Sequence, residues 1–386
     1  MLIKGGLVFG QDGTFTEKDV YIKDERIVTE QMYGSIGGKR DEEKCDTSVI
    51  NAEGCYVIPG LMDVHFHGCV GYDFCDGTQE AIAAMAKYEL ENGITSINPA
   101  TMTLGEDTLF QIAKTAAQYR RAGHTEGAEL VGINMEGPFI SLEKKGAQNP
   151  KYIHTPDAEM FDRLQNAAEG LFRLCVVAPE EPGAMEFIDA CHDKVAISVA
   201  HTTADYDTAK EAFDRGAKQV THLYNAMPAF SHRAPGVIGA ACDSDCMVEL
   251  ICDGIHVHPS VIRTTFKMFG DDRIVLISDS MMATGMEDGQ YSLGGLAVTV
   301  KGNLAVLTEG GAIAGSATNL MDCLRYAVKT AQIPLESAVK CATVNPAKAI
   351  GLFADYGSIE AGKYADLVIL DKDLQIQQVI KKGKIV

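Results

Sequence analysis

The sequence predicts an α/β protein, and three features of the chain support this fold class. From about residue 60 onward, short apolar segments typical of strands alternate with longer amphipathic segments typical of helices. The first fifty or so residues and the last thirty instead contain short strand-like segments separated by glycine and aspartate. The length of 386 residues suits one large domain together with a smaller one.

The two terminal segments are predicted to form a small β domain. Near the N-terminus, LIKGGLVFG and DVYIKDERIV are apolar or alternate between apolar and polar residues. The last segment, ADLVILDKDLQIQQVIKKGKIV, has the same character. We therefore expect residues 1–57 and 358–386 to pair into one small β-sandwich domain, with residues 58–357 inserted between them as the larger domain.

The central segment contains eight strand-like stretches, and helical patterns such as TQEAIAAMAKYELENG follow most of them. This repetition predicts a (β/α)8 TIM-like barrel, although a doubly wound sheet would show the same alternation. Residues 136–156 interrupt the alternation and are too long for a simple connector, which favours a functional loop. Residues 281–316 also interrupt it, and we expect an excursion with a hairpin. The expected strands cover residues 61–65, 95–98, 130–135, 172–177, 195–200, 219–222, 247–252 and 274–278.

Composition excludes several classes of partner. The net charge is −19, with 34 basic residues against 53 acidic ones. Nucleic acids and anionic membranes are bound by clustered Lys and Arg, so neither is expected as a partner.

The N-terminal MLIKGGLVFG lacks the apolar run of a secretory leader, and no apolar stretch reaches membrane-spanning length. The 11 cysteines are scattered through apolar segments, and even the tightest group, Cys242, Cys246 and Cys252, is better explained as core than as a zinc cluster. We therefore expect a cytoplasmic protein with reduced thiols.

Candidate metal ligands follow the expected strands, at the ends where a barrel carries its active site. His65 and His67 end the first strand, and their spacing directs both imidazoles to the same side of an extended segment. Glu136 ends the third strand, His201 the fifth and His222 the sixth. Nitrogen and oxygen donors of this kind suit zinc or iron.

The eighth strand ends in a further candidate, Asp279 in the segment ISDS. Each candidate also has an ordinary explanation, because a lone histidine is commonly a satisfied, partly buried residue and Asp279 could cap the next element. The joint occurrence of four histidines, one glutamate and one aspartate at the ends of five strands favours a metal site. His256, in DGIHVHP just beyond the seventh strand, lies where it could touch a substrate.

A set of motifs runs in order from about residue 55 to residue 371. The opening PGLMDVHFHG and the closing GKYADLVILD are patterns shared across a large hydrolase superfamily. Between them lie NMEGPFIS, VAHTTADY, THLYNAMPAFSHRAPG, CDGIHVHP, ISDSMMATG and AGSATNL. Together these motifs resemble the N-acetylglucosamine-6-phosphate deacetylase family of the amidohydrolase superfamily, and HLYNAM followed by RAPG is specific to the deacetylases.

The resemblance implies metal-dependent removal of the acetyl group from N-acetylglucosamine 6-phosphate, giving glucosamine 6-phosphate and acetate. It implies that His65 and His67 bind a first metal, that Glu136 bridges or binds, and that His201 and His222 bind a second metal. Many superfamily members bridge with a carbamylated lysine on the fourth strand, but CVVAPE contains no lysine here. We expect one or two divalent ions per chain, with zinc favoured and iron, manganese or cobalt also suited to these donors.

The resemblance also implies roles around the metals. Asp279 resembles the general acid/base that takes a proton from water and delivers it to the leaving amine. Asn225, Ala226 and Arg233 resemble sugar-phosphate contacts, and His256 resembles a sugar contact. The planar guanidinium of arginine suits phosphate. In the family this arginine reaches the active site of the neighbouring subunit, which implies a homodimer with Arg233 acting across the interface.

One residue departs from the family pattern. The loop KKGAQNP carries Gln148 where many members have a histidine that is thought to polarise the substrate carbonyl. Gln148 can still donate a hydrogen bond from its amide, but it cannot carry charge.

Three other functions remain open on the sequence alone. The substrate could be the epimer N-acetylgalactosamine 6-phosphate, because one hydroxyl orientation depends on loop geometry. Another amidohydrolase, such as one acting on a cyclic amide or a deaminase, would share the ligands but should lack the LYNAM and arginine signature. A relative without catalysis would typically lose metal ligands, which are all present here.

Overall fold

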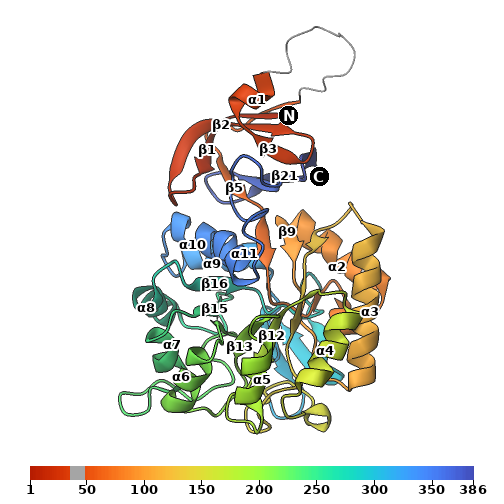
Figure 1. Cartoon of the computed structure of the whole chain (residues 1–386). Helices are drawn as coiled ribbons and strands as arrows, with labels where there is room; N and C mark the ends of the chain where they lie inside the picture. Colours follow the sequence, from red (N-terminus) through yellow and green to blue (C-terminus); the bar gives the residue numbers. More distant parts are fainter. Residues whose placement is uncertain (35–47) are drawn as a thin grey trace.

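The computed structural model describes residues 1–34 and 48–386, and its core is the parallel α/β arrangement that the sequence predicts (Figure 1). The core strands form two parallel sheets, with the orders β10-β9-β6 and β11-β12-β13-β14-β15-β16. Each of the eight expected stretches coincides with a strand, and the third holds two, β10 and β11. The bounds are β6 Leu61–Asp63, β9 Ile94–Ile97, β10 Glu129–Leu130, β11 Ile133–Met135, β12 Phe172–Val177, β13 Ala196–Val199, β14 Gln219–Val220, β15 Met247–Ile251 and β16 Ile274–Ile277.

Backbone contacts join the two sheets at both sides. Ala100 and Asn134 form a parallel bridge between the segment that follows β9 and strand β11. On the other side, the amide of Asp279 donates to the carbonyl of His65 over 2.9 Å, and the amide of His67 donates to that of Ser280 over 2.7 Å. The strands therefore succeed one another around a ring, and the segments that follow β6 and β16 lie together.

Helices follow most of the core strands and surround them (Figure 1). Helix α2 illustrates their origin, because Thr78 caps its first turn and apolar residues recur along its buried face, among them Ile82, Met85 and Leu90. None of the helices in the described residues combines the length and the apolar character needed to cross a membrane. The bounds are α2 Gln79–Glu91, α3 Glu106–Ala122, α4 Ala158–Ala167, α5 Ala184–Cys191, α6 Tyr206–Asp214, α7 Gly236–Cys242, α8 Pro259–Phe269, α9 Leu320–Lys329, α10 Leu335–Ala342 and α11 Val344–Ala349.

Strands from both ends of the chain share one sheet, as the sequence predicts. Its order is β22-β21-β20-β5-β1-β2-β3, with β4 paired to β1, so the terminal segments meet where β20 lies antiparallel to β5. The predicted sandwich is not confirmed, because these strands form a single hydrogen-bonded sheet. Residues 35–47 lie outside the described residues, and the domain limits at 57 and 358 stay a prediction. The bounds are β1 Leu2–Phe9, β2 Phe15–Lys23, β3 Arg26–Val28, α1 Glu30–Gly34, β4 Val49–Asn51, β5 Tyr56–Pro59, β20 Leu367–Leu370, β21 Ile376–Lys381 and β22 Lys384–Ile385.

The two interrupting segments differ in structure. The excursion after β16 contains the expected hairpin as part of a three-stranded antiparallel sheet of β17 (Gly289–Leu293), β18 (Leu296–Lys301) and β19 (Leu304–Leu307). The loop of residues 136–156 has only the short 3-10 helix η2 (Pro150–Tyr152). Both segments contribute to the cavity described below. The remaining short elements are β7 Gly68–Cys69, β8 Tyr72–Asp73 and η1 Phe74–Asp76.

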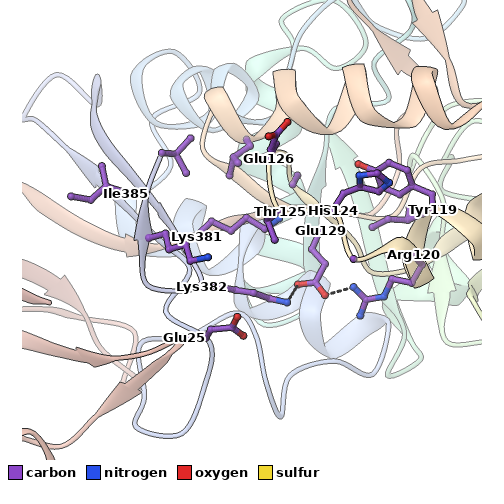
Figure 2. Close-up of a pocket in the computed structure, with 16 residues that line it drawn as sticks. Glu25, Tyr119, Arg120, His124, Thr125, Glu126, Glu129, Lys381, Lys382 and Ile385 are labelled. Atoms are coloured by element: carbon purple, nitrogen blue, oxygen red, sulfur yellow. Dashed lines mark hydrogen bonds and ion pairs between the residues drawn. The ribbon is translucent and has the colours of Figure 1, made fainter. Parts of the chain in front are cut away.

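A cavity of about 410 Å³ lies between the terminal sheet and the parallel core (Figure 2). Lys381 and Lys382 reach it from the C-terminal strands, while Arg120 comes from the end of α3 and Glu129 from β10. The buried Glu129 carboxylate pairs with Arg120 and, over 2.8 Å, with the ammonium group of Lys382. The contact with Lys382 ties the terminal sheet to the core, whereas the contact with Arg120 lies within the core.

Candidate metal centre and active site

The candidate site lies at the C-terminal ends of the parallel strands, around a cavity of about 290 Å³. Five of the six residues predicted for the metal centre from their positions at strand ends line this cavity, together with four predicted substrate contacts. His65 is fully buried beneath them and joins the same cluster through Glu136. The predicted residues that line the cavity are His67, Glu136, Gln148, His201, His222, Asn225, Ala226, His256 and Asp279.

Glu136 is the centre of the cluster. Its Oε1 atom lies 3.1 Å from Nε2 of His222, 3.2 Å from Nε2 of His201 and 3.4 Å from Nε2 of His65. Its Oε2 atom lies 3.2 Å from Nε2 of His67. One carboxylate thus faces four imidazoles, with a different oxygen toward His67 than toward the other three.

Two overlapping groups of donors result. Glu136, His201 and His222 form one group, and their ligand atoms all lie within 4.8 Å of one another. His65, His67 and Asp279 form the second group under the same limit. The Oδ1 atom of Asp279 lies 3.4 Å from Nε2 of His67 and 3.7 Å from Nε2 of His65. Because Glu136 also faces the second group, it can bridge two ions.

The backbone turns sharply where several of these side chains enter the cavity. His201, His222, Ala226 and Asp279 have φ angles of 46°, 31°, 52° and 49°. Residues other than glycine rarely adopt this left-handed region, and such conformations gather at functional sites. His201, His222 and Asp279 each lie two residues beyond the end of β13, β14 or β16, and Ala226 lies further along the loop after β14.

The donor set fits divalent metal ions. Imidazole nitrogens and carboxylate oxygens are the ligands that zinc takes in catalytic sites. The buried Nε2 atom of His65 has no hydrogen-bond partner among the described residues, although it faces the carboxylates of Glu136 and Asp279. A cation among these groups would satisfy this nitrogen. The described residues form two such metal-ligand groups, and neither contains a cysteine.

The carboxylates also set the protonation of the cluster. Burial by itself lowers the pKa of the His67 imidazole, but the contacts with Asp279 and Glu136 outweigh burial and raise this pKa to about 10. Burial raises the pKa of Glu136, whereas the surrounding histidines hold it well below its usual range. A metal ion at these groups would compete with protons for the imidazole nitrogens.

The predicted substrate contacts surround the metal groups. The Oε1 atom of Gln148 accepts a hydrogen bond from the amide of Thr103 over 2.7 Å, and its Nε2 donates to Oε2 of Glu136 over 2.7 Å. These two bonds fix the orientation of the amide group. The Nδ1 atom of His256 lies 2.7 Å from the buried carboxylate of Asp253. Asn225 uses its amide to bond the carbonyl of His222 over 3.1 Å, which holds the turn after β14.

Arg233 is not brought to the cavity within one chain. Its side chain is exposed and lines a separate hollow of about 340 Å³, together with residues such as Tyr206 and Pro228. The predicted role across a subunit interface therefore stays a prediction.

Three polar residues at the site were not predicted from the sequence. Glu249 contacts His65, Asp253 contacts His256, and Thr103 orients Gln148. Glu249 carries the clearest signal, because a carboxylate stands inside the apolar strand stretch MVELIC. Asp253 and Thr103 carry no comparable signal, since Asp and Thr are common in loops.

Comparison with known proteins places the chain in a family of hydrolases. The model of the amidohydrolase family matches residues 56–386. The N-acetylglucosamine-6-phosphate deacetylase of Bacillus subtilis (strain 168) is 35% identical over 389 residues, which cover 100% of this chain and 96% of that protein. The N-acetylgalactosamine-6-phosphate deacetylase of Escherichia coli O157:H7 is 32% identical, over 89% of this chain and 91% of that protein.

A solved structure extends the similarity to three dimensions. The Mycobacterium smegmatis N-acetyl-D-glucosamine-6-phosphate deacetylase, an aspartate-to-alanine mutant in complex with N-acetyl-D-glucosamine-6-phosphate, superposes with a TM-score of 0.89. The two chains are 33% identical, and the match covers 100% of this chain and 98% of that one.

Proposed function

The chain belongs to the amidohydrolase family, and we propose that it removes the acetyl group from N-acetyl-D-glucosamine 6-phosphate, giving D-glucosamine 6-phosphate and acetate. The observation that carries this proposal is the buried cluster in which Glu136 is shared by two metal-ligand groups beside Asp279. The family supplies the reaction class, and relatives that match nearly the full chain supply the substrate. Hydrolysis of this substrate belongs to amino-sugar catabolism, and the cytoplasm remains the predicted compartment.

We assign the metal ligands to the two groups. Glu136, His201 and His222 would hold one divalent ion, and His65 and His67 would hold another, with Glu136 shared. When bound, such an ion makes water a better nucleophile at neutral pH and polarises the substrate carbonyl. Zinc is the favoured ion, while iron, manganese and cobalt suit the same donors.

Asp279 is assigned as the general base and then the general acid. Its Oδ1 atom takes a proton from the water whose oxygen attacks the acetyl carbon. The same atom then gives a proton to the amide nitrogen, so that the carbon–nitrogen bond breaks and a neutral amine leaves. The Oδ1 atom lies 3.4 Å from Nε2 of His67, which places this carboxylate beside the proposed metal ligands.

Gln148 is assigned to the carbonyl oxygen of the substrate. Its Oε1 is occupied by the Thr103 amide, and one of its two N–H groups is occupied by Glu136. The second N–H group can donate to the acetyl oxygen as negative charge develops there. A glutamine would thus supply the hydrogen bond that a histidine supplies in many relatives, without its charge.

The sugar and its phosphate are assigned to the remaining predicted contacts. Asn225, Ala226 and His256 line the cavity and would contact the sugar. Arg233 is exposed and would bind the phosphate in the active site of a second subunit, which requires a homodimer. The galactosamine epimer is less favoured as substrate, because the glucosamine deacetylases include the relative with the higher identity.

Metal removal tests the proposal. The purified chain should lose acetate release from N-acetyl-D-glucosamine 6-phosphate after dialysis against a chelator, and added Zn²⁺ should restore it. Unfolding curves before and after dialysis serve as the control, since loss of folded protein would mimic loss of metal. Full activity in a preparation without stoichiometric metal would contradict the proposal.

A further inference from the structure

Glu249 is a buried carboxylate in an unusual place. It lies in the middle of strand β15, is 0% exposed, and has the apolar residues Val248 and Leu250 as neighbours in the chain. Burial of a carboxylate without partners is strongly unfavourable, so its contacts must compensate. These contacts are with residues of the candidate metal centre.

Both oxygens of Glu249 are engaged. The Oε2 atom lies 2.9 Å from Nδ1 of His65 and accepts a hydrogen bond from the amide of His222 over 3.2 Å. The Oε1 atom accepts a hydrogen bond from Nε2 of Gln219 over 2.5 Å. One carboxylate oxygen thus touches a member of each metal-ligand group, through the side chain of His65 and the backbone of His222.

The contact with His65 determines which ring nitrogen is free. A carboxylate can only accept, so Nδ1 carries the proton and donates it to Glu249. The lone pair then lies on Nε2, the nitrogen that faces Glu136 and Asp279 and has no partner among the described residues. Imidazoles that bind metals are commonly held by an acceptor on their second nitrogen. The other metal-ligand imidazoles lack a carboxylate in this position within residues 1–34 and 48–386. The Nδ1 atom of His201 bonds the carbonyl of Lys144 over 2.8 Å, and the Nδ1 atoms of His67 and His222 have no partner in that part of the chain.

We propose that Glu249 is a positioning residue that holds His65 in the tautomer and orientation needed to bind metal. This inference rests on the proposed function, because it assumes that the group containing His65 and His67 binds a metal ion. Glu249 contacts the imidazole of His65 but only the backbone of His222, so its effect should fall on the site of His65 and His67. Loss of Glu249 should weaken the ion at His65 and His67 while the ion at Glu136, His201 and His222 remains.

Titration of the metal-free chain with Co²⁺ tests the inference, because the visible absorption of Co²⁺ reports ligand binding. The wild-type chain should bind two equivalents. The Glu249→Leu variant should bind one equivalent tightly and the other about 10–100-fold more weakly, the usual loss when a residue supporting a metal ligand is removed. Glu249→Gln should recover part of this loss, since the amide oxygen can still accept from His65 if the Gln219 amide turns over.

Gln219→Leu is the matched control. This substitution removes the buried amide of Gln219, which is the other side-chain partner of Glu249, but leaves the contact between Glu249 and His65. This variant should be destabilised and should still bind two equivalents with wild-type affinity. If Glu249→Leu does not fold, Glu249→Gln carries the test, and its second equivalent should be weaker than in the wild type.

Three results would overturn the inference. The first is unchanged Co²⁺ affinity in the folded Glu249 variants, and the second is an equal loss in Gln219→Leu. The third is a wild-type chain that binds only one equivalent. Co²⁺ binding is measured without sugar, so inactivity toward N-acetyl-D-glucosamine 6-phosphate would count against the proposed function alone.

Discussion

At the scale of single residues, the proposed chemistry depends most on Asp279. The carboxylate follows β16, and its left-handed backbone with a φ of 49° turns it toward the histidines. Burial raises the pKa of Asp279, but the contacts with His67 and His65 outweigh burial and lower it. The group is therefore ionised at neutral pH, as a base for water must be.

Replacement of Asp279 by asparagine should remove the proton shuttle while it keeps the shape of the side chain. We expect kcat for N-acetyl-D-glucosamine 6-phosphate to fall by at least about 10²–10⁴-fold, the usual contribution of a general acid/base, with substrate still bound. The measurement is steady-state acetate release together with metal content. Asp157→Asn is the control, because Asp157 caps α4 outside the site and asparagine caps a helix about as well. Near-normal turnover in Asp279→Asn with intact metal would exclude Asp279 from this role.

Arg233 can be tested by the same assay on two substrates. Arg233→Ala should raise KM strongly for the 6-phosphate sugar and change little for the unphosphorylated sugar, because only the phosphate is paired with the guanidinium. Arg121→Ala, at another exposed arginine, should leave both KM values unchanged. Equal losses on both sugars would remove Arg233 from phosphate binding.

At the scale of elements, the sequence predicts strands better than it predicts contacts between them. Every core strand was predicted because apolar runs such as those of β12 and β16 are buried on both faces. The prediction that the histidines at the strand ends lie together depends on these strands, because parallel strands end on the same side of the core. The Glu249 contact could not be predicted, because it depends on how β15 and the segment after β6 approach each other. The number of sheets in the terminal segments could not be predicted either, because alternation of apolar and polar residues indicates strands but not how many sheets they form.

The contact between the terminal sheet and the core gives a prediction at this scale (Figure 2). Burial raises the pKa of Glu129, but Lys382 and Arg120 outweigh burial and lower it. Glu129→Gln should lower the free energy of unfolding by about 1.5–3 kcal/mol at pH 7, the usual range for hydrogen bonds to charged groups. Because the folded-state pKa is depressed, the wild-type advantage is complete above the ordinary glutamate range and is lost as pH falls through the folded pKa.

Denaturant unfolding at several pH values measures this difference. Arg121→Gln is the control, because Arg121 and Glu169 form an exposed ion pair, and its effect should stay within about 0.5 kcal/mol. A Glu129→Gln variant as stable as the wild type at pH 7 would mean that the ion pair with Lys382 does not stabilise the contact between the terminal sheet and the core.

At the scale of the whole molecule, the fold explains why distant parts of the sequence make one site. The metal groups combine residues that follow β6, β11, β13, β14 and β16, and the excursion after β16 adds Ile313 and Gly315 to the cavity wall. The proposed phosphate contact is the exception, because Arg233 is exposed in the single chain. The complete site as proposed therefore needs the second subunit.

Acetate release from four sugars tests the proposed function most directly. The purified, zinc-loaded chain is assayed with N-acetyl-D-glucosamine and N-acetyl-D-galactosamine, each with and without the 6-phosphate. We expect the highest kcat/KM for N-acetyl-D-glucosamine 6-phosphate, a lower value for its epimer, and large losses for both sugars without phosphate. No acetate from N-acetyl-D-glucosamine 6-phosphate, or a higher kcat/KM for the galactosamine epimer, would contradict the proposed function.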